Sequence, residues 1–149
     1  MKLKKIMIVS ANYYPNISSN MEQDVKKYLR NIYKDFNKGS LVVNVPGVFE
    51  IPVTIAKNIK KYDAFIALGC VIKGETPHFD FISQASTNAI MELSINYKKP
   101  IGNGIITCLN MRQAKARKKK GAEAVKAVIS ILSQKWELLI IKKTILELL

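Results

Sequence analysis

The sequence predicts an α/β protein in which a parallel sheet of four strands lies between two layers of helices. Two observations predict this fold class. Short apolar runs rich in β-branched residues alternate with longer amphipathic stretches in the order βαβαβαβαα. The third run, from Tyr62 to Ile72, is apolar nearly throughout, which is typical of a central parallel strand. Strands separated by helices require right-handed crossovers, so the sheet should be parallel and covered on both faces.

The chain should begin with a strand and a long helix. Residues 4–10 form a short apolar run that predicts a strand, and proline and asparagine in residues 12–16 interrupt it as a loop. An amphipathic pattern follows and predicts a helix. Ser19 precedes Glu22 by three residues, which is a capping-box spacing at a helix start, and Gly39 should end the helix.

The middle of the chain supplies the second and third strands, each followed by a helix. Residues 41–45 predict the second strand, and residues 48–60 predict the helix after it. After the third strand, Thr76 has the residue type of an N-cap and Pro77 suits the first helical position. The helix that they start should reach about Tyr97, with one stripe formed by Phe81, Ala85, Ala89, Leu93 and Tyr97.

The last third adds a fourth strand over residues 101–107, a short helix over 110–119 and a long helix from Ala122. The 149 residues suit a single domain, 1–149, with a divergent helical tail over about 134–149. No apolar run approaches the roughly 20 residues that span a bilayer. The apolar run near the N-terminus is too short for a signal peptide, so we expect a cytoplasmic protein without a membrane partner.

The net charge of +13 leaves two interpretations, a nucleic-acid footprint or a lysine-rich solvated surface. The lysines are scattered, and the dense run at residues 117–120 contains no aromatic residue, so we expect no nucleic-acid partner. Cys70 and Cys108 have neither a metal-ligand spacing nor the pattern of a disulfide framework. Buried free thiols in a reducing compartment, and no metal site, are therefore expected.

Candidate functional residues follow the strands, at the edge where α/β sheets bind ligands. Glu75 and Thr76 lie at a helix start, where unpaired backbone N–H groups can hold a phosphate; a plain helix cap is the alternative. His78 is the only histidine, and the ordinary pKa of histidine allows proton exchange near neutrality. Beside an anion site it could act as a general acid, although a structural or surface role remains open.

Three further strand ends carry candidates. Glu50, in the loop 46–52, could hydrogen-bond a planar heterocycle or could simply favour a helix start. Tyr13 could stack on a flat ring or pack as an ordinary aromatic residue. Arg117 could hold a phosphate with its charged fork or be one more surface cation. The residues alone thus indicate an anion site, one proton-transfer residue and an aromatic-lined strand edge.

Three segments, PGVFEIP, GCVIKGETPHFDFI and PIGNGIITCLNMRQAKAR, resemble the lumazine synthase family in their order and spacing. The resemblance covers about residues 4–133. It implies a flavodoxin-like three-layer α/β/α sandwich and a transferase of riboflavin biosynthesis without metal or organic cofactor. The implied reaction condenses 5-amino-6-(D-ribitylamino)uracil with 3,4-dihydroxy-2-butanone 4-phosphate to 6,7-dimethyl-8-ribityllumazine, releasing phosphate and water.

By motif position, the resemblance implies that His78 is the proton donor. It implies that Glu75, Thr76 and Arg117 bind the butanone phosphate. Lys120 is a further candidate, because Lys120 and Gly121 stand where the family has a Lys-Gly pair. The residues implied to contact the ribitylaminouracil are Tyr13, Val48, Phe49, Glu50, Cys70, Val71, Ile72 and Asn103.

The resemblance also implies a homo-oligomer built from pentamers, with the active site between adjacent subunits. One chain would supply Arg117 and the fourth strand, and the next would supply Tyr13, Phe49 and His78. The loop after Arg117 is shorter than usual and the tail from Gln134 departs from the family pattern, so a pentamer, a pentamer pair and a hollow shell all stay open. The alternative function is a catalytically weak shell-forming or flavin- or lumazine-binding paralogue; the intact proton donor and phosphate-binding residues favour the enzyme.

Overall fold

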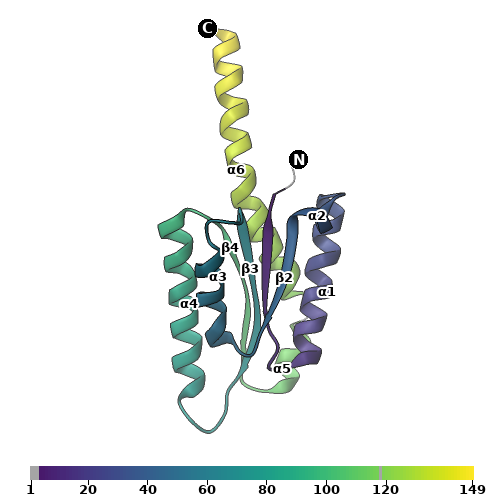
Figure 1. Ribbon diagram of the computed structural model, residues 1–149, viewed down its shortest axis with the longest axis vertical. Coiled ribbons are helices and arrows are strands. Elements are labelled where there is room, and N and C mark those ends of the chain that lie inside the picture. Colours follow the sequence, from purple (N-terminus) through teal and green to yellow (C-terminus); the bar gives the residue numbers. More distant parts are fainter. Residues whose placement is uncertain (1–3, 118) are drawn as a thin grey trace.

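The computed structural model describes residues 4–117 and 119–149, with the side chains of 135–139 left aside. It confirms the predicted α/β fold (Figure 1). Four parallel strands lie in the order β2-β1-β3-β4. The elements are β1 (Ile6–Ala11), α1 (Pro15–Ile32), α2 (Phe36–Gly39), β2 (Ser40–Val45), the 3-10 turn η1 (Val48–Glu50), α3 (Ile51–Asn58), β3 (Ala64–Ile72), α4 (His78–Tyr97), β4 (Ile101–Cys108), α5 (Met111–Ala116) and α6 (Lys120–Leu148).

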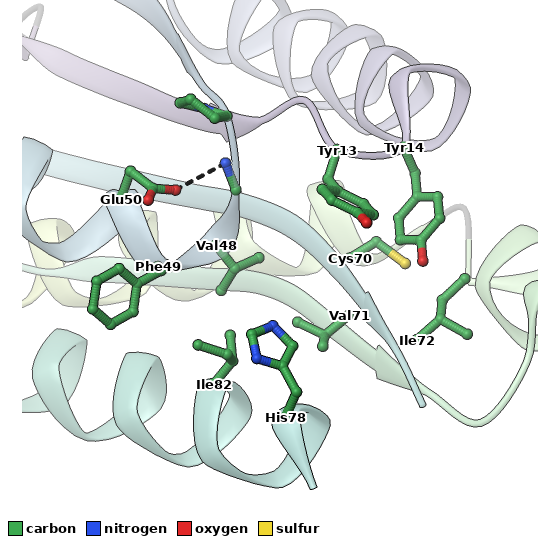
Figure 2. Close-up of a pocket in the computed structure, with 12 residues that line it drawn as sticks. Tyr13, Tyr14, Val48, Phe49, Glu50, Cys70, Val71, Ile72, His78 and Ile82 are labelled. Carbon is green, nitrogen blue, oxygen red and sulfur yellow. Dashed lines mark hydrogen bonds between the residues drawn. The ribbon is translucent and has the colours of Figure 1, made fainter. Parts of the chain in front are cut away.

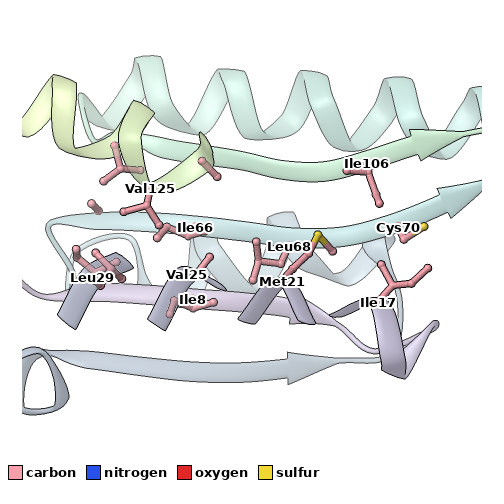
Figure 3. Close-up of a cluster of buried hydrophobic side chains, with 14 of the residues drawn as sticks. Ile8, Ile17, Met21, Val25, Leu29, Ile66, Leu68, Cys70, Ile106 and Val125 are labelled. Carbon is pink, nitrogen blue, oxygen red and sulfur yellow. The ribbon is translucent and has the colours of Figure 1, made fainter. Parts of the chain in front are cut away.

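The sheet divides the core into two layers, because successive side chains of a strand point to opposite faces. Ile6 and Ile8 of β1 join the cluster under α1 and α6, part of which is drawn in Figure 3. Met7 and Val9 join the cluster under α3 and α4. β1 and β3 are the central strands, and their carboxyl ends lie side by side with the η1 loop and the start of α4.

The first helix starts earlier than predicted. α1 begins at Pro15, and its N-cap Tyr14 makes no side-chain cap, so the capping box at Ser19 and Glu22 was wrong. Proline supplies the φ angle of a first helical position and lacks the N–H that would be unpaired there. The Ser18 hydroxyl donates to the Tyr14 carbonyl at 2.9 Å, which closes the first turn. The helix also ends at Ile32 rather than near Gly39.

The α4 helix starts later than predicted, and the stripe noted in the sequence is not its buried face. It begins at His78, one residue later than expected, with Thr76 Oγ1 accepting from the His78 amide at 3.4 Å. Its buried row contains Ser86 and Ile90, whereas Phe81 and Tyr97 of the predicted stripe are exposed. Apolar side chains lie on several sides of this helix, so spacing alone fitted more than one face.

α6 lies directly on β4 at Gly102, where an added Cβ would overlap the backbone carbonyl of Ala124. We expect Gly102→Ala to lower the free energy of unfolding by about 1–3 kcal/mol, because a backbone atom cannot swing aside as a flexible side chain can. Urea denaturation would measure the loss. Gly74→Ala is the matched control, since a Cβ there meets nothing within 4 Å. Equal stability of the two variants would contradict this close approach.

Candidate active site

A cavity of about 380 Å³ opens at the carboxyl ends of β1 and β3, bounded by the η1 loop and the first turns of α4 (Figure 2). This volume falls within the usual range of small-molecule sites, roughly 300–1,000 Å³. The lining residues are Tyr13, Tyr14, Pro46, Gly47, Val48, Phe49, Glu50, Cys70, Val71, Ile72, His78 and Ile82.

Two aromatic rings stand at the rim of this cavity. Tyr13 is 71% exposed and Phe49 is 67% exposed, which is unusual for such large apolar surfaces. The ring of Tyr13 packs edge to face against the ring of Tyr14, with centroids 5.0 Å apart. This contact restricts the orientation of the Tyr13 ring. Exposed, braced rings beside a cavity are suited to stacking on a planar heterocycle.

The η1 loop that carries Phe49 is held by two local contacts. Val48 is buried against β3 at Gly69, where a Cβ would lie only 2.6 Å from Val48 Cγ2. One carboxylate oxygen of Glu50 accepts a hydrogen bond from the Gly47 amide at 3.0 Å. Glu50 therefore stabilises the loop through one oxygen, and the second oxygen can accept from a ligand in the cavity.

His78 is the first residue of α4, and its exposed imidazole lies beside Val71 and Ile82 in the cavity wall. Because the first amides of a helix have no partner within the helix, an anion bound at this end would be attracted by the N–H groups and the helix dipole. The imidazole could then exchange a proton with a molecule that occupies the cavity and carries such an anion.

Cys70 forms part of the cavity wall but is not activated. Burial raises the pKa of the Cys70 thiol to about 12, with a smaller contribution from the neighbouring Cys108. Burial also raises the pKa of Cys108, and the nearby Arg117 charge partly opposes that effect. Both cysteines are free and buried, as predicted. At neutral pH Cys70 is protonated, so its position in the wall favours packing and polar contact over nucleophilic attack.

Asn103, Arg117 and Lys120 lie elsewhere. They line a second cavity, of about 680 Å³, along the exposed edge of β4, and it shares no lining residue with the first. Arg117 Nη1 donates to the Thr107 carbonyl at 3.2 Å, which fixes the position of its guanidinium group. Glu75 and Thr76 are exposed in the β3–α4 loop and line neither cavity.

One chain therefore gathers only part of the predicted site. The predicted residues that share the first cavity are Tyr13, Val48, Phe49, Glu50, Cys70, Val71, Ile72 and His78. Those on the β4 edge are Asn103, Arg117 and Lys120. A single chain offers a ring-binding cavity with a proton-transfer residue, and separately a cationic edge that suits an anion.

Comparison with known proteins gives the same family as the motifs. The sequence matches the 6,7-dimethyl-8-ribityllumazine synthase family over residues 3–135. The chain belongs to this family. It is 37% identical to the 6,7-dimethyl-8-ribityllumazine synthase of Agrobacterium fabrum, over 89% of this chain and 95% of that protein.

Two further relatives have a similar level of identity. The chain is 39% identical to 6,7-dimethyl-8-ribityllumazine synthase 1 of Rhodopseudomonas palustris, over 86% of this chain and 83% of that protein. It is also 39% identical to the 6,7-dimethyl-8-ribityllumazine synthase of Bartonella henselae, over 87% of each chain. The lumazine synthase match ends inside α6, so most of the tail lies beyond it.

The first cavity of this lumazine synthase family member is also lined by four residues that were not among the predicted site residues, although two of them belong to the predicted loop 46–52: Tyr14, Pro46, Gly47 and Ile82. Ile82 follows His78 by four residues and therefore lies on the same side of α4, a spacing that could have identified it. Tyr14 adjoins Tyr13, but only the fold shows that both neighbouring side chains reach the cavity.

Within residues 4–117 and 119–149, no group of three or more histidine, cysteine, aspartate or glutamate side chains is arranged to hold a metal ion. None of the helices in this part of the chain is long and apolar enough to cross a bilayer. Lys118, within the basic run at residues 117–120, lies outside the described residues.

Proposed function

We propose that this protein is a 6,7-dimethyl-8-ribityllumazine synthase that acts in riboflavin biosynthesis. It condenses 5-amino-6-(D-ribitylamino)uracil with 3,4-dihydroxy-2-butanone 4-phosphate and releases phosphate and water. The observation that carries the proposal is the single cavity in which exposed aromatic rings, Glu50 and His78 meet, in a chain of this family. The reaction uses neither a metal ion nor an organic cofactor.

The first cavity is the proposed site for the aminouracil. Tyr13 and Phe49 provide flat apolar surfaces for the pyrimidine ring. Glu50 and the backbone of residues 70–72 supply acceptors and donors for its polar edge and the ribityl chain. Val48 fills the cavity floor and keeps the η1 loop against β3.

The second substrate is proposed to bind with its phosphate at the start of α4. Glu75 and Thr76 provide backbone amides and a hydroxyl there, and the helix dipole favours the negative charge. The substrate amine then attacks the ketone, water leaves to give an imine, phosphate is eliminated, and ring closure releases water. His78 would donate and accept the protons that these steps require, because its imidazole lies in the wall of the first cavity and at the start of α4, where the two substrates are proposed to bind.

The remaining phosphate-binding residues require a second chain. Arg117 and Lys120, with Asn103, lie on the β4 edge in a different cavity from His78. We therefore infer a homo-oligomer built from pentamers, in which the β4 edge of one subunit completes the His78 cavity of the next. The partners of the site would be the two small-molecule substrates. In this arrangement the neighbouring subunit would also cover the exposed rings of Tyr13 and Phe49.

We further propose that residues 1–149 form one lumazine synthase domain, with 134–149 as a divergent helical tail. The family match over residues 3–135 and the continuous α6 helix support this division. A cytoplasmic location is supported by the two buried free thiols, which are typical of proteins from reducing compartments.

The test is to mix purified protein with the aminouracil and the butanone phosphate and to follow lumazine absorbance against a protein-free control. Enzyme-dependent formation, faster than the control, is the expected result. A folded, oligomeric protein that gives no acceleration would refute the enzymatic function and would support the lumazine-binding paralogue instead.

A further inference from the structure

The last part of α6 leaves the body of the protein. The helix runs without a break from Lys120 to Leu148. Its first turns pack on the core through Val125 and Val128, and Leu132 is the last of its residues in that cluster. Beyond it, Figure 1 shows the helix extending past the sheet, with no other element beside it. We call residues 134–149 the tail.

The exposed surface of the tail is mostly apolar. Its exposed large side chains are Ile140, Ile141, Ile145, Leu146, Leu148 and Leu149. An isolated helix of this length is marginal in water, and most helical stability in proteins comes from packing an apolar face. An apolar surface of this kind on a soluble protein marks an interaction site. The tail therefore needs a partner that covers this surface.

Four apolar residues of the tail, together with Ile131 just before it, follow a repeat of seven residues. Ile131, Leu138 and Ile145 are spaced by seven, and so are Ile141 and Leu148, three residues further on in each repeat. These are the a and d positions of a coiled coil, which form the seam between helices. Leu138 is placed by its sequence register alone. The repeat starts at Ile131, in the part of α6 just before the tail, and continues into the tail.

The charges beside this seam favour a parallel arrangement of identical helices. In that register, Glu137 stands at a g position and Lys142 at the following e position, which face each other across a parallel seam. An antiparallel pair would instead place e positions opposite each other, and residues 135 and 142 are both lysines. Opposite charges at e and g set the partner and the orientation of coiled coils.

We propose that the tail is a self-association element, through which copies of this chain bind one another as a parallel helical bundle. Leu139 and Leu146 fall at b positions and Ile140 at a c position of this register, so the seam itself is formed by the a and d residues and flanked by the e and g residues.

A lipid bilayer fits the tail less well than other copies do. The apolar part, residues 138–149, would be about 18 Å long as a helix, at about 1.5 Å per residue. The hydrocarbon core of a bilayer is about 30 Å thick. A surface-bound helix would need a strongly basic polar face, but the tail has lysines at 135, 142 and 143 against glutamates at 137 and 147.

A cysteine placed in the seam provides the direct test. In a parallel, in-register bundle, residue 145 of one tail meets residue 145 of the next. We expect full-length Ile145→Cys, oxidised with copper phenanthroline, to give disulfide-linked dimers severalfold faster than Lys143→Cys, which lies on the outer face of the same helix. The native Cys70 and Cys108 are buried and serve as the unmodified background. Equal rates in the two variants, or no dimer from Ile145→Cys, would overturn the proposal.

A second pair of variants tests the seam without new thiols. Ile141→Gln with Ile145→Gln should lower the mass found in sedimentation and raise the protein concentration at which half of the chains are assembled, whereas Lys143→Gln with Thr144→Gln should change neither. Glutamine keeps helix propensity in both pairs. Tail-dependent binding to phosphatidylserine-containing vesicles, together with unchanged sedimentation of the seam variant, would overturn self-association in favour of a membrane surface. No tail residue whose side chain the structure describes lines either cavity. Lumazine formation is therefore expected to be equal in the two cysteine variants and the two glutamine double variants, so a failure of the proposed enzymatic function can be told apart from a failure of tail self-association.

Discussion

His78→Ala is expected to lower the turnover number for lumazine formation by about 10²–10⁴-fold, the usual contribution of a general acid–base group. The imidazole lies in the wall of the cavity at the start of α4, where it can exchange protons with a bound substrate. Removing it leaves the aromatic rings, Glu50 and the helix amides in place. The Michaelis constants for both substrates should therefore change little, and steady-state kinetics would measure the two effects separately.

The matched control for this variant is Lys27→Ala, which removes an exposed cation on the outer side of α1, far along the chain from the cavity residues. Its turnover number should equal that of the original protein. If both variants lost activity to the same extent, or if His78→Ala raised the Michaelis constants and left turnover intact, proton transfer by His78 would be refuted.

Arg117→Ala is expected to raise the Michaelis constant for the butanone phosphate by about 10–100-fold, the loss of a hydrogen bond to a charged group. The guanidinium is positioned by its bond to the Thr107 carbonyl and lines the cavity on the β4 edge. The constant for the aminouracil should be unchanged. Arg117→Lys should restore the affinity only in part, because an ammonium group cannot bind phosphate in the bidentate geometry of a guanidinium.

Arg112→Ala is the control, since Arg112 is an exposed arginine on α5, the short helix that precedes Arg117, and does not line the β4-edge cavity. An equal rise in the Michaelis constant for both arginine variants would indicate a general effect of charge. An unchanged constant in Arg117→Ala would remove Arg117 from the phosphate site.

The strands were predicted well because each is a short run rich in β-branched and apolar residues, and burial on both faces makes the central strands β1 and β3 apolar nearly throughout. β3 covers Ala64–Ile72 within the predicted 62–72, and β4 covers Ile101–Cys108 against 101–107. Helix starts were predicted less well. Pro15 starts α1 before Ser19, because proline at a first helical position competes with a later capping box. The buried side of α4 differs from the stripe noted in the sequence, since the packing direction depends on its neighbours in the sheet.

The candidate site was predictable in part for a physical reason. Parallel strands end at the same edge of a sheet, so residues after β1, β2 and β3 had to converge, and those of the first cavity do. The β4 edge is different, because within one chain Arg117 and Asn103 line a separate cavity from His78. Residue spacing within one chain does not predict which surface of a second chain would lie against the first cavity. The place of Ile82 in the cavity wall depends on which side of α4 faces the cavity.

The central claim is that two chains build each site, and co-assembly of two impaired variants, assayed at a butanone phosphate concentration well below the Michaelis constant of Arg117→Ala, tests it most directly. His78→Ala and Arg117→Ala chains with different affinity tags would be co-expressed, and the mixed oligomers would be purified through both tags and assayed for lumazine formation. With random mixing, about one quarter of the sites in a closed ring receive an intact His78 from one chain and an intact Arg117 from its neighbour. The account predicts recovery of about that fraction of the original activity; activity no higher than the mean of the two separate variants would contradict it.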